Sequence, residues 1–482
     1  MHHVLRPLWS DFHYKEHQEV GVQWMLQREN LGDGGILCDE MGLGKTIQMV
    51  SLIKHAAKGP REETLLVAPV AVLWQWKSVL KRAGMSVYIP AKSGLSWILE
   101  EAATSQLAPH IHVIGYEAAL RKTVLVKAYK WRRVIYDEAH RLAGNNSSAK
   151  LATVLKRVYT WLLTATPIIN KLKDLVNLLT ILGLEVPPRN DIHSLEQIVK
   201  EYVMARTMEH LRPTNPEIPA KADIHMCEME FLTEDEREFY QGMTGHITRR
   251  WKAIEADGSP GASLEKLKLF MRLRQLSLHP QVYIAARKSA LKGLYTRQDW
   301  EGTSTKFEGI RNLITNNTIT HKWIVFCHFR LEMQMLSDIL KAETDVDIVQ
   351  QYHGGISAAE KQDVIERTHL PVAEGKQEVL LVQLQSGGVG LNLQHFDNII
   401  FTGPWWTNAL MEQAIGRAVR IGQKKQVNVY ILRLKEETTI NIDVYMLQKA
   451  NEKGDLCKKV LANANQTVSL CRESNATASS SV

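Results

Sequence analysis

Residues Asp39 to Thr46 read DEMGLGKT, and this stretch decides the fold of the chain. The apolar run 35–38 before it predicts a buried strand, and residues 47–57 after it predict a helix. A strand, a glycine-containing loop and Gly-Lys-Thr at the start of a helix are the pattern of a phosphate-binding loop. The free N–H groups of the first helical turn and the helix dipole both favour a polyphosphate at that position. The stretch therefore predicts a nucleotide site.

Two residues of this loop have specific expected roles. Lys45 would reach the β- and γ-phosphates of ATP, and the Thr46 hydroxyl would hold Mg²⁺. Nucleotide contacts are expected from the whole loop: Asp39, Glu40, Met41, Gly42, Leu43, Gly44, Lys45 and Thr46. Asp39 departs from the general pattern G-x-x-x-x-G-K-[ST], since it stands where the first glycine is expected. A plain turn is the alternative for the loop taken alone.

Composition places the chain among ordinary globular proteins. Its 482 residues are 45% hydrophobic and 23% charged, and the length suggests about three domain-sized units. The formal net charge is +7, from 59 Lys and Arg against 52 Asp and Glu. This mildly basic balance permits nucleic-acid binding without requiring it.

The cysteines and the apolar runs bear on the compartment. Five cysteines occur without any C-x-x-C pair, which indicates a reducing, intracellular environment and argues against a zinc site. No apolar run approaches the roughly 18 residues that a membrane span needs, and the N-terminus lacks a secretory pattern. We therefore expect neither a membrane nor a zinc ion among the partners.

Apolar strands alternate with helical patterns along most of the chain, which predicts an α/β fold with parallel sheets and helices on both faces. In the first half the predicted strands are 64–69, 111–116, 132–136 and 162–167. In the second half they are 323–327, 348–352, 379–383, 398–401 and 427–434. Between the halves, long helical patterns at 233–251 and 264–278 dominate. No second phosphate-binding loop appears, which fits one nucleotide shared by two lobes.

The pair Asp137-Glu138 follows the apolar strand 132–136. In an enzyme with a phosphate-binding loop, an acid at this place holds Mg²⁺ through its water shell. The adjacent Glu138 would orient and deprotonate the attacking water. Two solvated acids at a strand end are the alternative. After the next strand, Thr164 and Thr166 offer hydroxyls that would hydrogen-bond to the acid strand or to the γ-phosphate.

Gln18 lies in a predicted helix that precedes the phosphate-binding loop. Its amide carries both a donor and an acceptor, so it would be able to read the edge of an adenine. A solvated helix face is the alternative, and the local sequence favours that alternative.

Arg417 and Arg420 lie three residues apart in a helix-like stretch after Thr407. Residues at i and i+3 share one face of a helix, so both guanidinium groups would point at one phosphate. An arginine placed on a transferring phosphoryl group is worth roughly 10³–10⁵ in rate. Two solvated arginines on a helix are the alternative.

Five motifs occur in order: DEMGLGKT (39–46), DEAH (137–140), LTATP (163–167), GGVGLNL (387–393) and QAIGRAVRIGQ (413–423). Together they resemble the SWI/SNF-type ATPases, a branch of the superfamily 2 helicase-like motors, from about Tyr14 to about Leu447. Asp39 is normal in that family. The DEAH spelling resembles the repair-associated subgroup, whose members often carry a RING finger between the lobes. This chain has no Cys/His array for such a finger.

The resemblance implies two RecA-like lobes with ATP between them. Residues 1–184 would form lobe 1, 185–300 helical protrusions and the crossing between lobes, and 301–456 lobe 2. Residues 457–482 are rich in Ser, Thr, Asn and Ala and are predicted to be a disordered tail. The resemblance also implies that Gly390 and Gln413 contact the nucleotide. Gly416 and Val419 stand where the family has an acid and a histidine, and we expect tuning rather than loss of activity.

Family position nominates contacts to the DNA backbone: Pro69, Tyr116, Arg330, Ser386, Gly387, Gly388 and Trp405. Trp405 belongs to a segment that resembles the family's P-x-W region, and a buried aromatic pair is the alternative there. Phosphate contacts carry no base code, so binding would be largely independent of sequence and sensitive to salt.

The expected function is an ATP-dependent translocase on double-stranded DNA that serves chromatin remodelling, repair or transcription. Nucleosomes or other DNA-bound proteins are the expected cargo. A strand-separating DNA or RNA helicase and a catalytically silent interaction module are the alternatives. The nucleus is the expected location in a eukaryote, and a large DNA virus or a bacterium is an equally open source.

Overall fold

A computed structural model describes residues 5–57, 62–103, 105, 108–186, 192–257, 262–316, 319–384, 391–436 and 440–479. The chain forms two compact units, and each is described by itself. Unit 1 comprises Met1–Pro219, Arg420–Gly422 and Glu452–Val482, and unit 2 comprises Ala220–Val419 and Gln423–Asn451.

Unit 1 is built on an eight-stranded sheet with the strand order β4-β3-β5-β2-β6-β7-β1-β8. All neighbouring strands are parallel except β3 and β4, which form an antiparallel pair at one edge. The strands are β1 (Gly35–Leu37), β2 (Glu63–Ala68), β3 (Ser86–Pro90), β4 (Trp97–Glu101), β5 (His110–Gly115), β6 (Trp131–Asp137), β7 (Arg157–Leu163) and β8 (Val203–Met204). The central strands are buried on both faces, as parallel strands covered by helices are.

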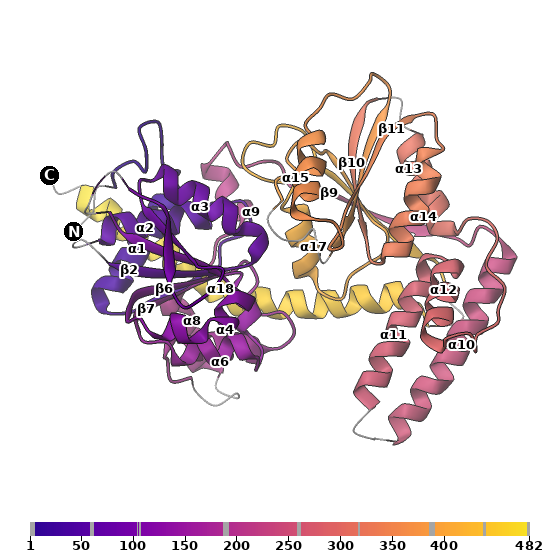
Figure 1. Cartoon of the computed structure of the whole chain (residues 1–482), viewed down its shortest axis with the longest axis horizontal. Coiled ribbons are helices and arrows are strands. Elements are labelled where there is room, and N and C mark those ends of the chain that lie inside the picture. Colours follow the sequence, from indigo (N-terminus) through magenta and orange to yellow (C-terminus); the bar gives the residue numbers. More distant parts are fainter. Residues whose placement is uncertain are drawn as a thin grey trace. The chain divides into compact units, whose positions relative to one another are not determined.

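Helices cover both faces of this sheet. Figure 1 shows α1, α2 and α3 on one side of it and α4, α6 and α8 on the other. The helices before residue 219 are α1 (Glu16–Leu31), α2 (Lys45–Ala56), η1 (Val70–Val72), α3 (Leu73–Arg82), α4 (Tyr116–Arg121), α5 (Thr123–Lys127), η2 (Ala139–Leu142), α6 (Ser147–Val154), α7 (Leu172–Leu182), α8 (Ile192–Tyr202), α9 (Met208–Leu211) and η3 (Arg212–Thr214). The predicted alternation of strands and helices in the first half is confirmed.

Lobe 1 extends past the expected boundary at residue 184. The short strand β8 pairs in parallel with β1, so the segment up to Pro219 belongs to unit 1. A strand of two residues lacks the length that a sequence pattern needs, which is why helical protrusions were expected there.

The prediction of a disordered tail from residue 457 is wrong for residues 457–464. These residues lie in α18 (Ile442–Ser479), a single long helix. Leu456, Cys457, Val460 and Leu461 pack against the hydrophobic core of unit 1, and Ala464 is buried in it. Their spacing of three and four residues gives one apolar helix face, which outweighs the polar composition of the segment.

Unit 2 is built on a six-stranded parallel sheet with the order β11-β12-β10-β13-β14-β9. Its strands are β9 (Asp223–Met229), β10 (His321–Cys327), β11 (Val346–Tyr352), β12 (Gln377–Gln383), β13 (Asn398–Phe401) and β14 (Asn428–Leu434). The strand β9 lies in the region where only helices were expected. It pairs with β14 along seven residues at the edge of the sheet, with Ile224 and Met226 exposed.

The helices of unit 2 include a long pair that projects from the sheet. Figure 1 shows α10 and α11 side by side, and they share an apolar cluster that includes Phe239, Ile247 and Phe270. The helices are α10 (Glu234–Asp257), α11 (Ala262–Leu278), α12 (Pro280–Leu291), α13 (Thr305–Thr315), α14 (Arg330–Lys341), α15 (Ala358–Arg367) and α17 (Asn408–Ile415). The helical protrusions expected between the lobes are therefore part of unit 2.

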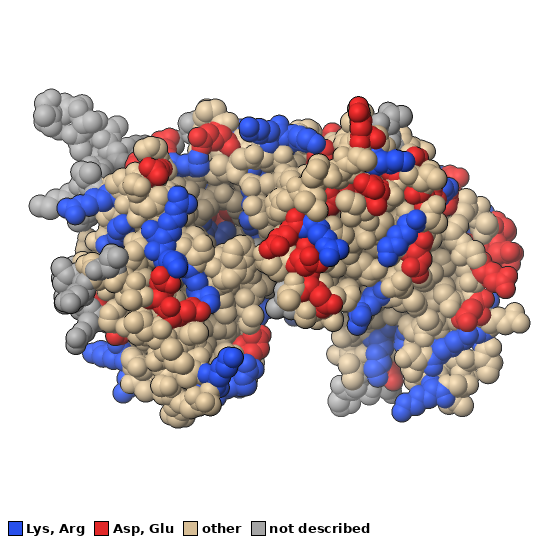
Figure 2. All heavy atoms as spheres, turned by 45° about the horizontal axis from the view of Figure 1, so that its top comes forward, with Lys and Arg blue, Asp and Glu red and all other residues tan. Residues whose placement is uncertain are grey.

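Charge and apolarity on the surface agree with the composition. Figure 2 shows Lys and Arg interspersed with Asp and Glu on the face in view. Among the described residues, none of the helices has the length and hydropathy of a membrane span. Within the same residues, no group of three or more His, Cys, Asp or Glu side chains is arranged to hold a metal ion.

Candidate active site

The phosphate-binding loop joins the end of β1 to the start of α2. Gly42 and Gly44 have φ angles of 88° and 83°, a left-handed conformation that side chains rarely adopt. A Cβ on Gly44 would also lie 2.5 Å from Nε2 of Gln18, so the side chain of Gln18 would have to move if Gly44 were replaced. The ammonium of Lys45 lies over the loop and donates to the carbonyl oxygens of Asp39 (2.5 Å) and Glu40 (3.4 Å). This places the cation where the oxygens of a polyphosphate would replace the carbonyls.

Asp39 is fully buried and explains why an acid replaces glycine at the first loop position. Arg206, which follows β8, donates from Nε to Oδ1 of Asp39 (2.8 Å) and from a terminal nitrogen to Oδ2. Gln48 of α2 donates to the same Oδ2 (2.9 Å). Burial alone would raise the pKa of Asp39, but Arg206 and Gln48 together hold it below its ordinary value. Asp39 therefore anchors the loop to β8 instead of facing the nucleotide.

Gln18 is buried and lies against the loop rather than on a solvated helix face. Its amide donates to the carbonyl oxygen of Leu43 (3.4 Å), and its Oε1 accepts from the backbone N–H of Lys15 (3.2 Å). The neighbouring His17 ring contacts the same Leu43 carbonyl (2.9 Å). These contacts place Gln18 beside the nucleotide loop, and its reading of an adenine edge remains a prediction.

Asp137 ends β6 and is held by three groups. The indole N–H of Trp76 donates to its Oδ2 (2.7 Å), and the backbone N–H of Glu138 donates to its Oδ1 (2.9 Å). The hydroxyl of Tyr116 donates to its backbone carbonyl (2.8 Å). Burial, with the adjacent Glu138 carboxylate, raises the pKa of Asp137 to about 6. A raised pKa marks a carboxylate that a nearby cation would stabilise in its charged form.

Glu138 has a strained backbone. Its φ of 51° and ψ of 49° are left-handed, a conformation that costs about 1–3 kcal/mol for a residue other than glycine. Its carboxylate lies 3.4 Å from Nδ1 of His140, and the same nitrogen contacts the Thr164 hydroxyl (3.3 Å). The Thr164 hydroxyl therefore contacts His140, which follows the acid pair, and its bond to the acid strand itself or to the γ-phosphate stays a prediction.

The sheet order brings these residues to one edge. Strand β7 lies between β1 and β6, and all three are parallel, so their carboxyl ends meet at the same edge. Thr164 follows β7 and donates its backbone N–H to the carbonyl of Leu37 at the end of β1 (3.2 Å). The Thr46 hydroxyl and the Asp137 carboxylate are hard oxygen donors, the kind that Mg²⁺ prefers. The residues of this edge therefore fit a magnesium-bound polyphosphate.

The segment with the two arginines, of which Arg417 belongs to unit 2 and Arg420 to unit 1, differs from the helix that the sequence predicts. Helix α17 ends at Ile415, and Gly416 caps it, so Arg417 and Arg420 follow in turns. Glycine in a helix costs roughly 1 kcal/mol relative to alanine, which favours the end at this position. The argument from a shared helix face is therefore wrong. Arg417 is 3% exposed, and its carbonyl accepts from the N–H of Leu393 (3.0 Å). Gln413 lies in the last turn of α17 and is partly exposed.

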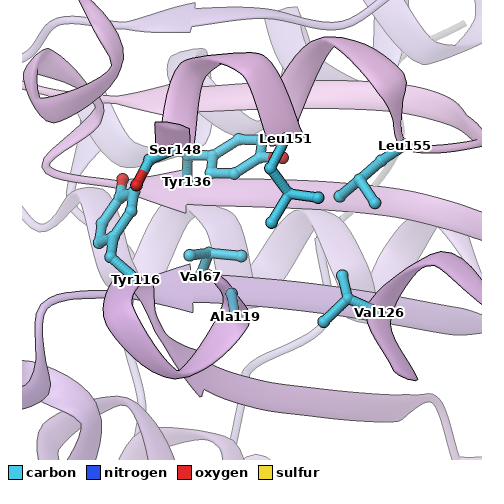
Figure 3. Close-up of a pocket in the computed structure, with 8 residues that line it drawn as sticks. All are labelled: Val67, Tyr116, Ala119, Val126, Tyr136, Ser148, Leu151 and Leu155. Carbon is cyan, nitrogen blue, oxygen red and sulfur yellow. The ribbon is translucent and has the colours of Figure 1, made fainter. Parts of the chain in front are cut away.

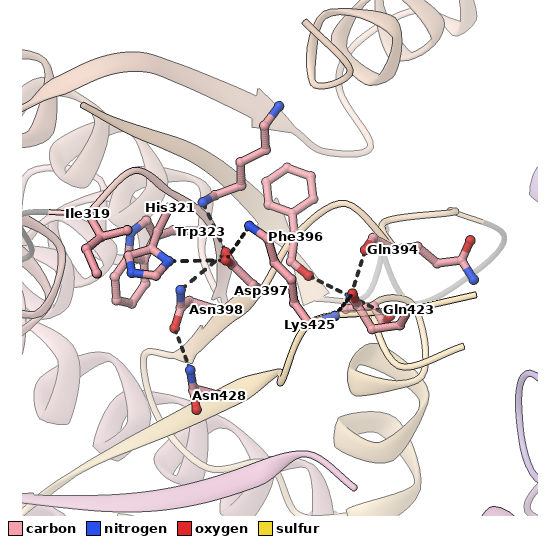
Figure 4. A network of polar contacts seen from close by, with 12 residues as sticks. Ile319, His321, Trp323, Gln394, Phe396, Asp397, Asn398, Gln423, Lys425 and Asn428 are labelled. Atoms are coloured by element: carbon pink, nitrogen blue, oxygen red, sulfur yellow. Dashed lines mark hydrogen bonds and ion pairs between the residues drawn. The ribbon is translucent and has the colours of Figure 1, made fainter. Parts of the chain in front are cut away.

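Gln423 fixes the turn that follows the arginines. Figure 4 shows its side chain among backbone groups of unit 2, where its amide donates to the carbonyls of Gln394 (2.7 Å), Phe396 (3.2 Å) and Ala418 (3.3 Å). Two residues on, Lys425 forms an ion pair with Asp397 (3.0 Å). The final glutamine of the motif is therefore a structural anchor.

The nominated DNA contacts differ in exposure. Pro69 is buried at the start of η1 beside Val70, which is 67% exposed, and Arg330 is exposed at the start of α14. Tyr116 is buried, and its hydroxyl is committed to Asp137. Trp405 is 3% exposed, between the His328 ring (5.2 Å between centroids) and the Arg274 guanidinium (4.2 Å from the centroid). Trp405 is therefore buried among aromatic side chains, as the alternative of a buried aromatic pair describes.

Ser386, Gly387, Gly388 and Gly390 lie outside the described residues.

Two residues of the site were missed by sequence reasoning. Trp76 belongs to none of the motifs, although a tryptophan that is buried needs an acceptor for its N–H. Arg206 follows a strand too short to predict. Each contacts a carboxylate that is far away in the sequence: Trp76 is 61 residues from Asp137, and Arg206 is 167 residues from Asp39.

Two domain families match the chain in order. Residues 17–187 match the SNF2-related domain, and residues 305–422 match the helicase conserved C-terminal domain. The first match covers the phosphate-binding loop and the Asp137-Glu138 pair, and the second covers the arginine segment.

Several characterised proteins are similar to nearly the whole chain. A "probable global transactivator" of Orgyia pseudotsugata multicapsid polyhedrosis virus is 26% identical over 92% of this chain and 91% of its own length. The ISWI chromatin-remodeling complex ATPase CHR11 of Arabidopsis thaliana is 25% identical, but the match covers only 40% of that protein. The chromatin remodeling factor mit1 of Schizosaccharomyces pombe is 26% identical over 32% of its length. The chain thus spans well under half of these remodellers.

Among solved structures, a Sulfolobus solfataricus SWI2/SNF2 ATPase core in complex with double-stranded DNA is similar over 98% of this chain and 97% of its own. The TM-score is 0.40 and the sequence identity 22%. The two domain matches, in family order and over the loop, the acid pair and the arginine segment, identify the chain as an ATP hydrolase that belongs to the SWI/SNF-type, superfamily 2 helicase-like ATPases.

Proposed function

We propose that the chain is a DNA-dependent ATPase that moves along double-stranded DNA and uses ATP hydrolysis to remodel DNA–protein complexes. One observation carries this proposal. In unit 1, the lysine of the loop, the acid pair and Thr164 follow β1, β6 and β7, three parallel strands whose carboxyl ends share one edge. Such an edge is the usual ligand site of an open α/β sheet.

Each residue of the edge has a part in hydrolysis. Lys45 binds the β- and γ-phosphates once these displace the carbonyls it contacts. Glu138 takes a proton from the water that attacks the γ-phosphate. Thr46 and Asp137 would hold Mg²⁺, which neutralises charge on the phosphate oxygens when bound.

The arginines connect hydrolysis to movement. We infer that Arg417 and Arg420 of the C-terminal lobe stabilise the charge that develops on the transferred phosphoryl group. ATP then has a higher affinity for the arrangement in which both lobes contact it, and hydrolysis removes that preference. With a DNA backbone held by each lobe, one cycle of binding and hydrolysis advances the protein along the duplex.

The proposed DNA contacts are largely backbone groups and single basic side chains at the ends of strands. They include the turns at Pro69-Val70 and Tyr116-Glu117 in lobe 1 and Arg330 in lobe 2. Figure 2 shows mixed charges rather than one basic face on the visible side, so a few precise phosphate contacts suit this surface better than a general basic groove. The similarity to chromatin-remodeling proteins supports nucleosomes or other DNA-bound proteins as cargo.

Phosphate release and displacement assays test this function. We expect ATP turnover to rise at least tenfold with double-stranded DNA and to rise less with single strands or RNA. We also expect a third strand to be displaced from a triplex while a plain duplex stays annealed. Strand separation of a duplex would instead favour the helicase alternative. A chain that hydrolyses no ATP with any nucleic acid would contradict both functions.

A further inference from the structure

The acid that would hold magnesium is fastened by two aromatic side chains from other elements. Trp76 of α3 donates to the carboxylate of Asp137 (2.7 Å), and Tyr116 at the start of α4 donates to its backbone carbonyl (2.8 Å). Trp76 is 1% exposed and Tyr116 is 3% exposed. Trp76 thus fixes the side chain, and Tyr116 fixes the strand end that carries it.

The two tryptophans of α3 show that this contact is specific. Trp74 is 61% exposed, whereas Trp76, two residues further along, is buried and donates to Asp137. A buried indole N–H needs an acceptor, and a carboxylate is a stronger acceptor than a carbonyl. The second oxygen of Asp137 accepts from the N–H of Glu138, so both oxygens are oriented by the protein.

The place of Tyr116 supports the same conclusion. Figure 3 shows its ring in the wall of a small pocket, with Tyr136 and Val67 beside it. The ring therefore packs on the sheet independently of the hydroxyl. The hydroxyl can be removed with the ring kept, so its bond to Asp137 can be tested alone.

Trp76 and Tyr116 lie in helices that follow strands close to β6, the strand that ends at Asp137. Trp76 comes after β2, which pairs with β6, and Tyr116 comes after β5, which pairs with β2. The sheet order is β5-β2-β6; α3 follows β2 by way of η1, and α4 follows β5 directly. The turns after β2 and β5 are the two nominated DNA contacts of lobe 1. Each of these turns is therefore within a few residues of a side chain that bonds to Asp137.

We propose that Trp76 and Tyr116 are positioning residues that connect the DNA-contacting turns of lobe 1 to the geometry of Asp137. This proposal rests on the function proposed above. A DNA backbone held at the two turns stabilises the positions of α3 and α4, and these in turn hold Asp137 in the orientation that suits magnesium. DNA stimulation of hydrolysis would pass through these two hydrogen bonds.

The first test measures binding without turnover. A fluorescent, non-hydrolysable ATP analogue is titrated with Mg²⁺ against the full chain and its variants. Trp76→Phe removes the donor and keeps an aromatic ring, and Tyr116→Phe removes only the hydroxyl. A hydrogen bond to a charged group is stronger than one between neutral groups, so Trp76→Phe should raise the Mg²⁺ concentration at half-maximal binding at least about tenfold. Tyr116→Phe should raise it less.

Matched controls are available in the same lobe. Trp131 is fully buried at the other end of β6 and donates to the carbonyl of Val126 (2.9 Å). Tyr159 is buried, and its hydroxyl donates to the carbonyl of Glu29 (2.9 Å). Trp131→Phe and Tyr159→Phe each lose a comparable bond away from Asp137. We expect both to keep the wild-type magnesium dependence.

The second test compares ATP turnover with and without double-stranded DNA. We expect Trp76→Phe and Tyr116→Phe to lose most of the stimulation, while both controls keep it. An unchanged magnesium dependence in Tyr116→Phe and Trp76→Phe, or an equal change in the controls, would overturn the proposal. If the wild type shows no stimulation by DNA, the proposed function fails, and the magnesium titration still decides whether the two residues position Asp137.

Discussion

Arg206 and Asp39 form a fully buried ion pair that joins the segment after β8 to the first residue of the phosphate-binding loop. The general loop pattern has glycine at this position, and a glycine has no side chain that could form such an ion pair. In this chain the carboxylate is charged, buried and satisfied by Arg206 and Gln48. The side chain of Asp39 thus anchors the first residue of the loop to Arg206 and Gln48.

We expect Arg206→Met to weaken both folding and nucleotide binding. Removing one partner of a buried ion pair costs about 3–5 kcal/mol, because the other charge is left buried. Thermal unfolding and the affinity for a fluorescent ATP analogue measure the two effects. Arg133→Met is the matched control, since Arg133 forms an equally buried pair with Glu29 in the same lobe. The control should lose comparable stability and keep its ATP affinity at temperatures where it is folded. Equal losses of affinity in both variants would contradict the anchor role.

Lys45→Ala and Glu138→Gln should each lower ATP turnover by more than about a hundredfold, for different reasons. Lys45→Ala removes the cation that binds the phosphates, so it should also lose affinity for ATP. Glu138→Gln removes only the base, so binding should persist. Phosphate release and equilibrium binding separate the two effects. Near-normal turnover in Glu138→Gln would show that another group deprotonates the water.

Much of the fold can be predicted from the local pattern of apolar residues. The elements that were missed lack a clear apolar pattern in their own sequence. The long alternating segments predicted most of the central strands of both sheets because these strands are buried and apolar on both faces. The strand predicted at 162–167 is displaced, since β7 spans Arg157–Leu163 and overlaps it only at Leu162 and Leu163. Strand β9 was missed because it lies at the edge of the sheet with Ile224 and Met226 exposed, so no continuous buried apolar run marks it. The helical segment 457–464 was missed because its polar residues hide an apolar face that exists only against unit 1.

The candidate site divides in the same way. The loop and the acid pair are contiguous in sequence, so chemistry and spacing were sufficient to predict them. Trp76 and Arg206 act on those acids from segments that only the tertiary fold brings near. The two arginines were predicted as site residues from their chemistry, but the helix on which they were expected ends before them. It ends at Ile415, because Gly416 terminates it.

Arg420→Ala should leave nucleotide binding mostly intact and slow hydrolysis by roughly 10³-fold or more, as for an arginine that acts on the transition state. Arg420 is the better probe of the pair because Arg417 is 3% exposed, so its removal would also disturb the packing of unit 2. Single-turnover hydrolysis at saturating ATP is the measurement. An equal loss of binding and turnover would contradict a role confined to the transition state.

The stability of unit 2 should depend on pH through His279, which caps α12. Its Nδ1 accepts from the N–H of Gln281 (3.0 Å), which requires that this nitrogen carry no proton. Burial lowers the pKa of His279 from 6.5 to about 4. The unfolded chain therefore binds the proton more readily, and the stability that neutral His279 provides is present above pH 6.5 and lost as pH falls toward 4. A shift of this size corresponds to about 3 kcal/mol over the whole window.

His279→Asn tests this, because asparagine is a good N-cap and does not titrate. We expect the variant to be slightly less stable than the wild type at pH 7.5, since the ring that packs on Phe307 is lost. At pH 5 the gap should close or reverse, as judged by thermal-unfolding midpoints at the two pH values. His328 and His395 also have lowered pKa values from burial, so part of the acid sensitivity should remain. A variant with the full wild-type slope would mean that the protonation of His279 does not limit the stability of this unit in acid.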